Sequence, residues 1–364
     1  MLRILVTGGA GFIGSNFVRF WIRRHPQDRL VNLDKLTYAG NLANLADIAT
    51  APHYRFVRGD IGDFALVDQL FREEKINRVV HFAAESHVDR SILGPGEFIR
   101  TNINGTFTLL EAARAHWRLD GGRAKSADRG DAGGFCFLHV STDEVYGSLG
   151  PNDPAFAEST PYAPRSPYSA TKAASDHLVS AYGHTFGVPV IITNCSNNYG
   201  PYQFPEKLIP LTIQRAIKRE TIPVYGKGEN VRDWIYVEDH CEALEAVLER
   251  GKIGETYNIG GGNQWRNLDL VQLICDKLDE RLGRDDAPRR KLIRFVEDRP
   301  GHDLRYAMDI GKISRALGWT PKVPMDVGIA KTIDWYLAHQ DWVERVMSGE
   351  YKNYFARQYG ARLR

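Results

Sequence analysis

The sequence predicts an α/β fold with a doubly wound parallel sheet and a smaller C-terminal α/β lobe. Up to about residue 195, short β-branched runs alternate with longer amphipathic stretches, which is the pattern of a sheet covered by helices on both faces. After residue 195 the composition shifts toward Pro, Asn, Gly and Tyr, which is typical of binding loops. We therefore expect one domain in residues 1–195 and a lobe made mainly of residues 196–364, with some later segments crossing back.

The strands of the first domain are predicted from near-continuous apolar runs, because such strands are buried on both faces. They are residues 4–7, 30–33, 54–57, 78–83, 136–141 and 188–193. In the C-terminal lobe, helical patterns occupy residues 209–218, 239–250 and 268–282, and a strand is expected at 256–259. Residues 118–134 combine several glycines with mixed charges and no apolar periodicity, so we expect a solvated loop.

The composition excludes several classes of protein. Lys and Arg number 47 against 45 Asp and Glu, which is too balanced for binding nucleic acid or a membrane surface by bulk charge. No apolar run could span a membrane, and the N-terminus reads as a strand and not as a signal peptide. The four cysteines are far apart without Cys-x-x-Cys spacing, so we expect reduced thiols, a cytoplasmic location and no metal site.

A glycine-rich turn follows the first predicted strand. Gly8, Gly11 and Gly14 form a Gly-x-x-Gly-x-x-Gly loop, and Phe12 and Ile13 open a helix that runs toward residue 25. Such a loop lets a pyrophosphate approach the helix N-terminus. This is the Rossmann-type pattern of a dinucleotide site, although strand-to-helix turns also use glycine for steric reasons alone.

A carboxylate ends the second strand, 20 residues after the last glycine of the loop. Asp34 at this position would accept hydrogen bonds from the adenosine ribose and repel a 2′-phosphate, which favours NAD over NADP. The alternative is a solvated turn residue. Asp60 and Ile61 follow the third strand, where Asp60 could bind the adenine edge or serve as an ordinary turn aspartate.

A Tyr-x-x-x-Lys motif follows Ser166 and Pro167, which are typical of a helix start. Tyr168 and Lys172 are then one turn apart on one helix face. The lysine ammonium is expected to lower the pKa of the phenol, so that Tyr168 can remove a proton from a sugar hydroxyl as a hydride leaves the same carbon. Alone, such a motif is usually a surface pair.

Two adjacent acids follow the fifth strand, at the sheet edge where these folds bind ligands. In Thr142, Asp143 and Glu144, like charges in a cleft would push the two pKa values apart and leave one acid protonated and one ionised. Elimination of water needs such a pair. The alternative is a helix N-cap followed by first-turn acids.

Together these motifs resemble the extended short-chain dehydrogenase/reductases that modify nucleotide sugars, and within them most closely the dTDP-glucose 4,6-dehydratases. The resemblance covers nearly the whole chain. It rests on the motifs above and on residues 34–41, 83–89, 197–201 and 299–303. The acid pair separates the dehydratases from the family's epimerases, which lack it, and from the UDP-glucuronate decarboxylases, which have serine where Asp143 stands.

The resemblance implies a lyase that converts dTDP-glucose to dTDP-4-keto-6-deoxyglucose, a precursor of rhamnose and other deoxysugars. Tyr168 would deprotonate the C4 hydroxyl, with Thr142 hydrogen-bonded to the same oxygen, as hydride passes to NAD. Glu144 would then remove the C5 proton, Asp143 would protonate the departing C6 hydroxyl, and the hydride would return to C6. NAD would stay tightly bound between turnovers, and the enzyme would be a homodimer joined by helices within residues 94–117 and 166–187.

The resemblance also implies the remaining binding residues. For the cofactor these are Lys35, Thr37, Ala83, Ala84, Tyr168 and Lys172. For the substrate they are Lys207, Arg232 and Arg299 at the diphosphate, Asn197, Asn267 and His302 as hydrogen-bonding partners, Tyr225 against the base, and Ser86, His87 and Leu208. A strand is expected to end near the cleft at Arg232. Tyr225 could instead be a core residue, and His87 and Asp89 could be structural.

Two other classes of function stay open at this point. One is a UDP-sugar dehydratase, epimerase or decarboxylase on the same scaffold; Asp34 argues against the NADP-dependent GDP-mannose branch. The other is a non-catalytic dinucleotide sensor, which the joint presence of the acid pair and the Tyr-Lys pair opposes.

Overall fold

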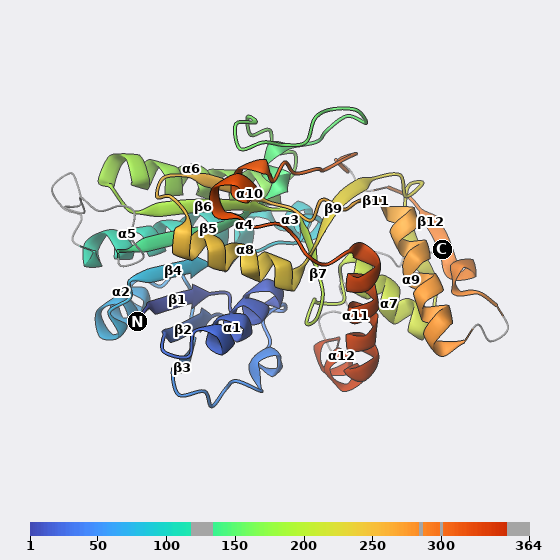
Figure 1. Cartoon of the computed structure of the whole chain (residues 1–364), viewed down its shortest axis with the longest axis horizontal. Coiled ribbons are helices and arrows are strands. Elements are labelled where there is room, and N and C mark those ends of the chain that lie inside the picture. Colours follow the sequence, from blue (N-terminus) through green and yellow to red (C-terminus); the bar gives the residue numbers. More distant parts are fainter. Residues whose placement is uncertain (118–133, 284–286, 299–300, 348–364) are drawn as a thin grey trace.

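The centre of the computed structural model is a seven-stranded parallel sheet in the order β10-β6-β5-β4-β1-β2-β3. Its strands are β1 (Arg3–Thr7), β2 (Arg29–Asp34), β3 (Tyr54–Arg58), β4 (Arg78–His81), β5 (Cys136–Thr142), β6 (Val190–Cys195) and β10 (Thr256–Ile259). The winding reverses between β1 and β4, which opens a crevice at the carboxyl ends of these strands. The predicted doubly wound sheet is confirmed (Figure 1). The structure describes residues 1–117, 134–283, 287–298 and 301–347.

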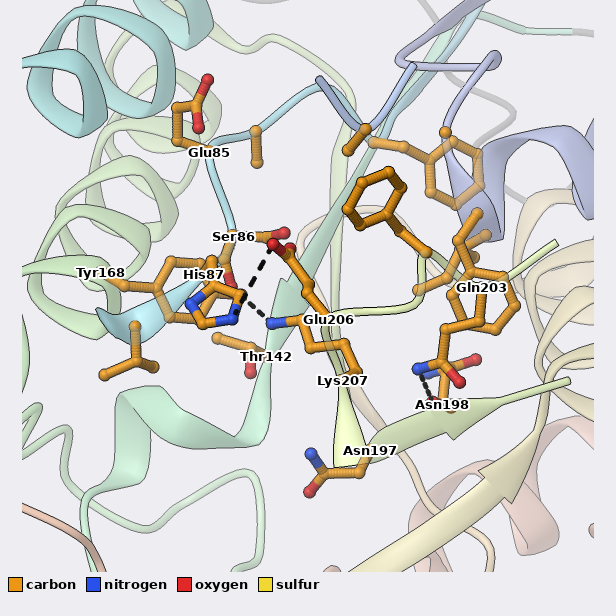
Figure 2. Close-up of a pocket in the computed structure, with 18 of the residues that line it drawn as sticks. Glu85, Ser86, His87, Thr142, Tyr168, Asn197, Asn198, Gln203, Glu206 and Lys207 are labelled. Atoms are coloured by element: carbon orange, nitrogen blue, oxygen red, sulfur yellow. Dashed lines mark hydrogen bonds and ion pairs between the residues drawn. The ribbon is translucent and has the colours of Figure 1, made fainter. Parts of the chain in front are cut away.

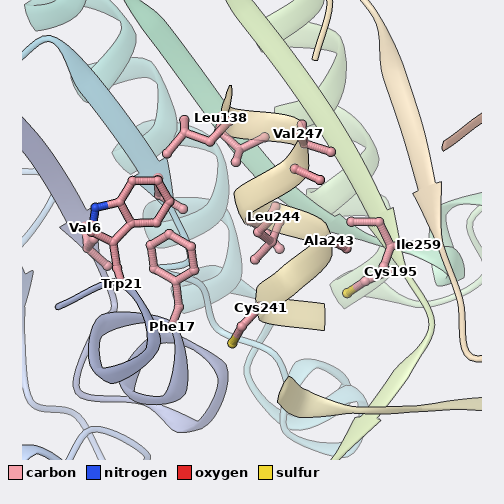
Figure 3. Close-up of a cluster of buried hydrophobic side chains, with 14 of the residues drawn as sticks. Val6, Phe17, Trp21, Leu138, Cys195, Cys241, Ala243, Leu244, Val247 and Ile259 are labelled. Carbon is pink, nitrogen blue, oxygen red and sulfur yellow. The ribbon is translucent and has the colours of Figure 1, made fainter. Parts of the chain in front are cut away.

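Helices cover both faces of this sheet. One face carries α1 (Phe12–Arg24), α8 (Val237–Arg250) and α10 (Gly311–Leu317), and the other carries α2 (Phe64–Glu74), α5 (Thr106–His116) and α6 (Pro167–Phe186). Side chains alternate along β1, so Ile4 and Val6 pack in the first cluster and Leu5 in the second. Figure 3 shows the first cluster, where Phe17 and Trp21 of α1 lie near α8.

A smaller lobe carries its own core and lies beside the sheet in Figure 1. It contains a three-stranded sheet in the order β11-β9-β7 and a parallel pair of β12 and β8. Its elements are β7 (Asn197–Tyr199), α7 (Leu208–Ile217), β8 (Ile222–Tyr225), β9 (Val231–Tyr236), β11 (Gln264–Arg266), α9 (Asn267–Leu282), β12 (Ile293–Val296), α11 (Met325–Ala338) and α12 (Gln340–Val346). Buried aromatic rings of Tyr199, Trp234 and Tyr336 fill this core.

The chain crosses from the lobe back into the first domain. After β9, helix α8 packs on α1, and β10 pairs with β6, with Thr256 opposite Ile192. The strand expected at 256–259 therefore forms an edge of the large sheet.

Short helical segments line the connections. They are η1 (Leu42–Leu45), α3 (Val88–Leu93), α4 (Pro95–Phe98), the π-helical η2 (Ile99–Gly105), η3 (Asp143–Tyr146) and η4 (Arg289–Leu292). Among the described residues, no helix combines the length and apolar character needed to cross a membrane.

Two predicted strands differ from the observed bounds by two residues, whereas the other predicted strands of the first domain differ by at most one residue at either end. The strand expected at 78–83 ends at His81, where the chain turns over the Gly8 loop, and the strand expected at 188–193 begins at Val190. Gly187 ends α6 in the left-handed region with φ +71°, and Pro189 cannot donate to a neighbouring strand. The predicted loop at 118–134 lies outside the described residues except for its last residue.

Candidate active site

A cavity of about 440 Å³ runs from the carboxyl ends of the central strands to the smaller lobe. Every site residue predicted from the sequence lines it, except Arg299, which lies outside the described residues. The sheet therefore brings together the glycine loop, the Tyr-Lys pair, the acid pair and the substrate residues predicted in the lobe.

The glycine loop of the cavity is close-packed against the neighbouring strand. Gly8 has φ +72°, and a Cβ there would lie 2.6 Å from the backbone nitrogen of Ala83. A Cβ on Gly14 would lie 2.3 Å from the Gly8 carbonyl oxygen. Helix α1 begins beyond Gly11 with no side-chain cap and no acid in its first turn. This end of the cavity therefore fits a pyrophosphate on backbone N–H groups.

Asp34 is buried at the end of β2 beside this loop and is not the solvated turn residue considered above. Its Oδ2 accepts a hydrogen bond from the Ala10 amide at 2.9 Å, and its Oδ1 accepts one from the Leu36 amide at 2.8 Å. Burial raises the pKa of Asp34, while these two hydrogen bonds favour the charged form. Asp60 forms an ion pair with Lys35 at 2.7 Å and also accepts from the Gly62 amide, as a turn aspartate does.

The Tyr-Lys pair sits on α6, which begins with a complete capping box. Ser166 accepts from the Ser169 amide at 3.0 Å, and the Ser169 hydroxyl accepts from the Ser166 amide at 3.0 Å. Tyr168 and Lys172 are both buried and both line the cavity.

The acid pair begins η3 directly after β5. Thr142 caps this short helix, because its Oγ1 accepts from the Glu144 amide at 3.3 Å, and the same Oγ1 lies 3.2 Å from Asp143 Oδ1. Asp143 is only 2% exposed. Its Oδ2 has no hydrogen-bond partner among the described residues. Thr142 therefore caps η3 and also lines the cavity together with the two acids.

Burial is the main cause that raises the pKa of Asp143 well above its usual range, and the nearby Glu144 and Asp233 carboxylates raise it further. Arg232 opposes this shift. Burial and the neighbouring carboxylates therefore favour the protonated form of Asp143. The division of the pair into one protonated and one ionised acid stays a prediction, and the shift is in the direction that it requires.

The predicted effect of Lys172 on Tyr168 is wrong for this structure. Burial raises the pKa of the Tyr168 phenol well above its usual value, and Glu144 raises it further, while a hydrogen bond with Thr142 lowers it. The Lys172 ammonium instead donates to the Val140 carbonyl at 2.9 Å. Desolvation of the phenolate and the nearby carboxylates set the net direction of the shift.

The lobe end of the cavity holds the predicted substrate residues. Arg232 is buried and is the second residue of β9, and its Nη2 donates to the Asp303 carbonyl at 2.8 Å. Asn197 and Asn267 each have a buried Oδ1 without a partner in the described part of the chain. Tyr225 is half-buried, lines the cavity and lies edge-on to His302, so it is not a core residue.

Sequence reasoning missed a buried acid at the centre of the cavity. Figure 2 shows Glu206 close to His87, whose Nε2 lies 4.0 Å from Glu206 Oε2. Tyr38 donates to Glu206 Oε1 at 3.2 Å, and Arg90 lies 3.5 Å from Oε2. The neighbouring Lys207 reaches the Ser86 carbonyl at 3.3 Å. The only signal in the sequence is that Glu206 directly precedes a predicted site residue.

A second group of titratable side chains lies elsewhere. His25, Glu245 and Glu249 have ligand atoms within 4.8 Å of one another, although no metal site was predicted. Arg24 already contacts the shared Glu245 Oε1 at 2.8 Å. A cation at this position would have to compete with that guanidinium.

The sheet order, the glycine loop and the Tyr-Lys pair define a dinucleotide-dependent enzyme of the extended short-chain dehydrogenase/reductase class. A family model described as GDP-mannose 4,6 dehydratase matches residues 5–332. The dTDP-glucose 4,6-dehydratase of Xanthomonas campestris pv. campestris (strain B100) is 57% identical over 349 residues, which cover 96% of this chain and 97% of that protein. The dTDP-glucose 4,6-dehydratase 1 of Escherichia coli (strain K12) is 53% identical, over 99% of this chain and all of that protein. This chain belongs to the dTDP-glucose 4,6-dehydratase family.

Solved structures are similar over nearly the whole chain. A dTDP-glucose 4,6-dehydratase from Streptomyces venezuelae with NAD and dTDP bound has a TM-score of 0.85 and 46% identity, covering 95% of this chain and 100% of that chain. The UDP-glucose 4-epimerase of Thermus thermophilus in complex with NAD has a TM-score of 0.79 and 29% identity, covering 93% and 100%. The predicted family and fold class are thus confirmed.

Proposed function

We propose that this chain is an NAD-dependent lyase that converts dTDP-glucose to dTDP-4-keto-6-deoxyglucose and water. The observation that carries the proposal is the buried Asp143, whose pKa burial raises, beside Glu144 and in the same cavity as Tyr168. The relatives named above support the choice of substrate and cofactor.

The residues at the glycine loop would hold NAD. The uncapped start of α1 would bind the pyrophosphate, Asp34 would accept from the adenosine ribose, and Lys172 would hold the nicotinamide half. When bound there, NAD accepts a hydride from the sugar and later returns it.

Four side chains of this chain would move protons or hold the substrate oxygen. Tyr168 takes the proton of the C4 hydroxyl, while Thr142 binds the same oxygen. The resulting C4 ketone makes the C5 hydrogen acidic, and Glu144 removes that proton. Asp143 donates its proton to the C6 hydroxyl, which leaves as water, and C5 regains a proton when the hydride returns to C6. One acid must start ionised and one protonated, and burial of Asp143 supports that assignment.

The lobe would bind the nucleotide diphosphate. Arg232 and Lys207 would meet the phosphates, and Asn197 and Asn267, whose buried Oδ1 atoms have no partner in the described residues, would add hydrogen bonds. Tyr225 would stack on the base. We also propose residues 1–195 and 196–364 as the main cofactor-binding and substrate-binding parts.

We further propose a cytoplasmic homodimer that feeds deoxysugar synthesis, including that of rhamnose. Large apolar side chains exposed on one segment, such as Ile99 and Phe107, support a partner surface next to α5 and α6. Light scattering of the purified protein should give twice the chain mass, and the chain mass alone would overturn the dimer.

The test of the activity is a side-by-side assay of dTDP-, UDP- and GDP-glucose. The protein as purified should release NAD on denaturation, and dTDP-glucose should give a 4-keto sugar, revealed by its absorbance in alkali, with no net change in reduced cofactor. Equal rates on UDP-glucose would overturn the base preference. NAD release without turnover of any of the three sugars would favour the sensor.

A further inference from the structure

Lys172 is surrounded by buried polar side chains that the proposed reaction does not use. We infer that Asp176, one turn further along α6, is a positioning residue that keeps the Lys172 ammonium charged and in place through His139. The inference rests on the proposed function for its kinetic test only. Its second test needs no substrate.

Asp176 is held as an acceptor of hydrogen bonds. Its Oδ2 accepts from the Ser141 hydroxyl at 2.7 Å and from the Tyr162 hydroxyl at 3.0 Å. Tyr162 in turn accepts from Asn194 Nδ2 at 3.1 Å, so the phenolic proton is directed to Asp176. Burial raises the pKa of Asp176 to about 6. The group is therefore mainly a carboxylate at neutral pH, despite being 2% exposed.

His139 joins this carboxylate to the lysine. Its Nε2 lies 3.1 Å from Asp176 Oδ1 and 3.4 Å from Lys172 Nζ. Burial and the Lys172 charge lower the pKa of His139 well below its usual value, so the ring is neutral. Because an ammonium can only donate, Nε2 accepts the hydrogen bond from Lys172, while Asp176 Oδ1 is close to the ring without a hydrogen bond to it. The neutral ring thus lies between the carboxylate and the ammonium, and Asp176 acts on Lys172 through its charge.

In the part of the chain that the structure describes, Asp176 is the carboxylate that acts on Lys172. The other titratable groups around the pair are His81 on β4, Tyr146 in η3, Tyr168 and His177 on α6, and Cys195 on β6. Burial raises the pKa of the Cys195 thiol to about 12 and lowers that of His81, which leaves both neutral. Asp176 is therefore the described acid whose charge favours protonated Lys172, against the burial that lowers its pKa.

The first test is the pH dependence of turnover in the Asp176→Asn variant. Asparagine keeps the shape and removes the charge, so the buried Lys172 should lose its proton at lower pH. We expect the alkaline limb of kcat to move down by at least about one pH unit, which is a tenfold loss of proton affinity. Activity should recover at acidic pH. Tyr162→Phe removes one hydrogen bond but keeps the charge, and should leave the alkaline limb in place.

The second test is a double-mutant cycle on the unfolding midpoint in urea. Removing one partner of a buried charge pair is destabilising, whereas removing both is close to neutral. Lys172→Met combined with Asp176→Asn should therefore be more stable than Asp176→Asn alone. If the single Asp176→Asn variant fails to fold, folding of the double variant supports the inference.

Two results would overturn it. One is an unmoved alkaline limb in a folded Asp176→Asn protein, which would leave Asp176 a structural residue only. The other is a double variant whose loss of stability equals the sum of the two single losses. Failure of the double variant to fold when Lys172→Met alone folds would count in the same way. If the wild-type protein turns over no nucleotide sugar, the proposed function fails, and the cycle still decides this inference.

Discussion

Asp143→Asn should separate oxidation of the sugar from loss of water. Asparagine has nearly the same volume and can keep the contact to Thr142, which is 3.2 Å in the structure. It has no carboxyl proton to give to the C6 oxygen. The substitution therefore removes the acid needed for loss of water. Tyr168 and Thr142, which act in oxidation at C4, are unchanged.

The size of the effect follows from the role of the proton. A positioned general acid contributes about 100- to 10,000-fold, so kcat for formation of the 4-keto-6-deoxy product should fall by about that factor. Asp143 is 2% exposed, which leaves little room for water to replace the lost acid. Oxidation at C4 should continue at close to the normal rate.

The assay follows absorbance near about 340 nm, where the reduced nicotinamide absorbs, after dTDP-glucose is mixed with excess enzyme. We expect reduced cofactor to accumulate to nearly one equivalent per site in the variant and only transiently in the wild type. In D₂O the sugar recovered from the variant should carry deuterium at C5, because Glu144 is intact. Asp341→Asn makes the same chemical change on the exposed first turn of α12 and should behave as wild type.

One result would refute this reasoning. If turnover collapses while the absorbance stays flat, Asp143 is needed for C4 oxidation and is not the acid for the leaving water. Normal turnover would exclude it from the chemistry altogether.

Three further predictions test other parts of the molecule. Tyr168→Phe should abolish the first hydride transfer with little change in the affinity for dTDP measured by calorimetry; a large loss of binding with turnover preserved at saturation would contradict this. Gly14→Ala places a Cβ 2.3 Å from the Gly8 carbonyl oxygen, so the NAD released on denaturation should fall severalfold while circular dichroism is unchanged; full NAD content would show that the loop can move. Arg289→Met leaves Asp279, its partner at 2.7 Å, as a buried unpaired charge, and should lower the free energy of unfolding in urea by about 3–5 kcal/mol; a loss below about 1 kcal/mol would show that this pair is solvated.

The fold was predictable from the sequence wherever local pattern and tertiary role agree. The buried strands of a parallel sheet are apolar on both faces, so runs such as residues 4–7 and 136–141 stood out. Strand ends were less predictable, because they depend on neighbours. Just beyond the end of β4 at His81, the backbone of Ala83 packs closely against Gly8, which is distant in sequence.

The site was predictable where spacing within one segment fixes geometry, as for Tyr168 and Lys172 on one helix face. Contacts between distant segments were not. Nothing local to Glu206 shows that Tyr38, in a turn after β2, and Arg90, on α3, will converge on it. The pKa of Tyr168 also depends on burial, which the spacing of a motif does not reveal.

The return of β10 and α8 to the large sheet constrains how the protein is made. The nascent chain cannot complete its cofactor half when residue 195 leaves the ribosome, because β6 still lacks its neighbour and α1 still lacks the helix that covers it. More than 60 further residues, up to Ile259, must be translated first. A chain released early would expose an unpaired strand edge and an apolar helix face, which are recognition features for chaperones and starting points for aggregation.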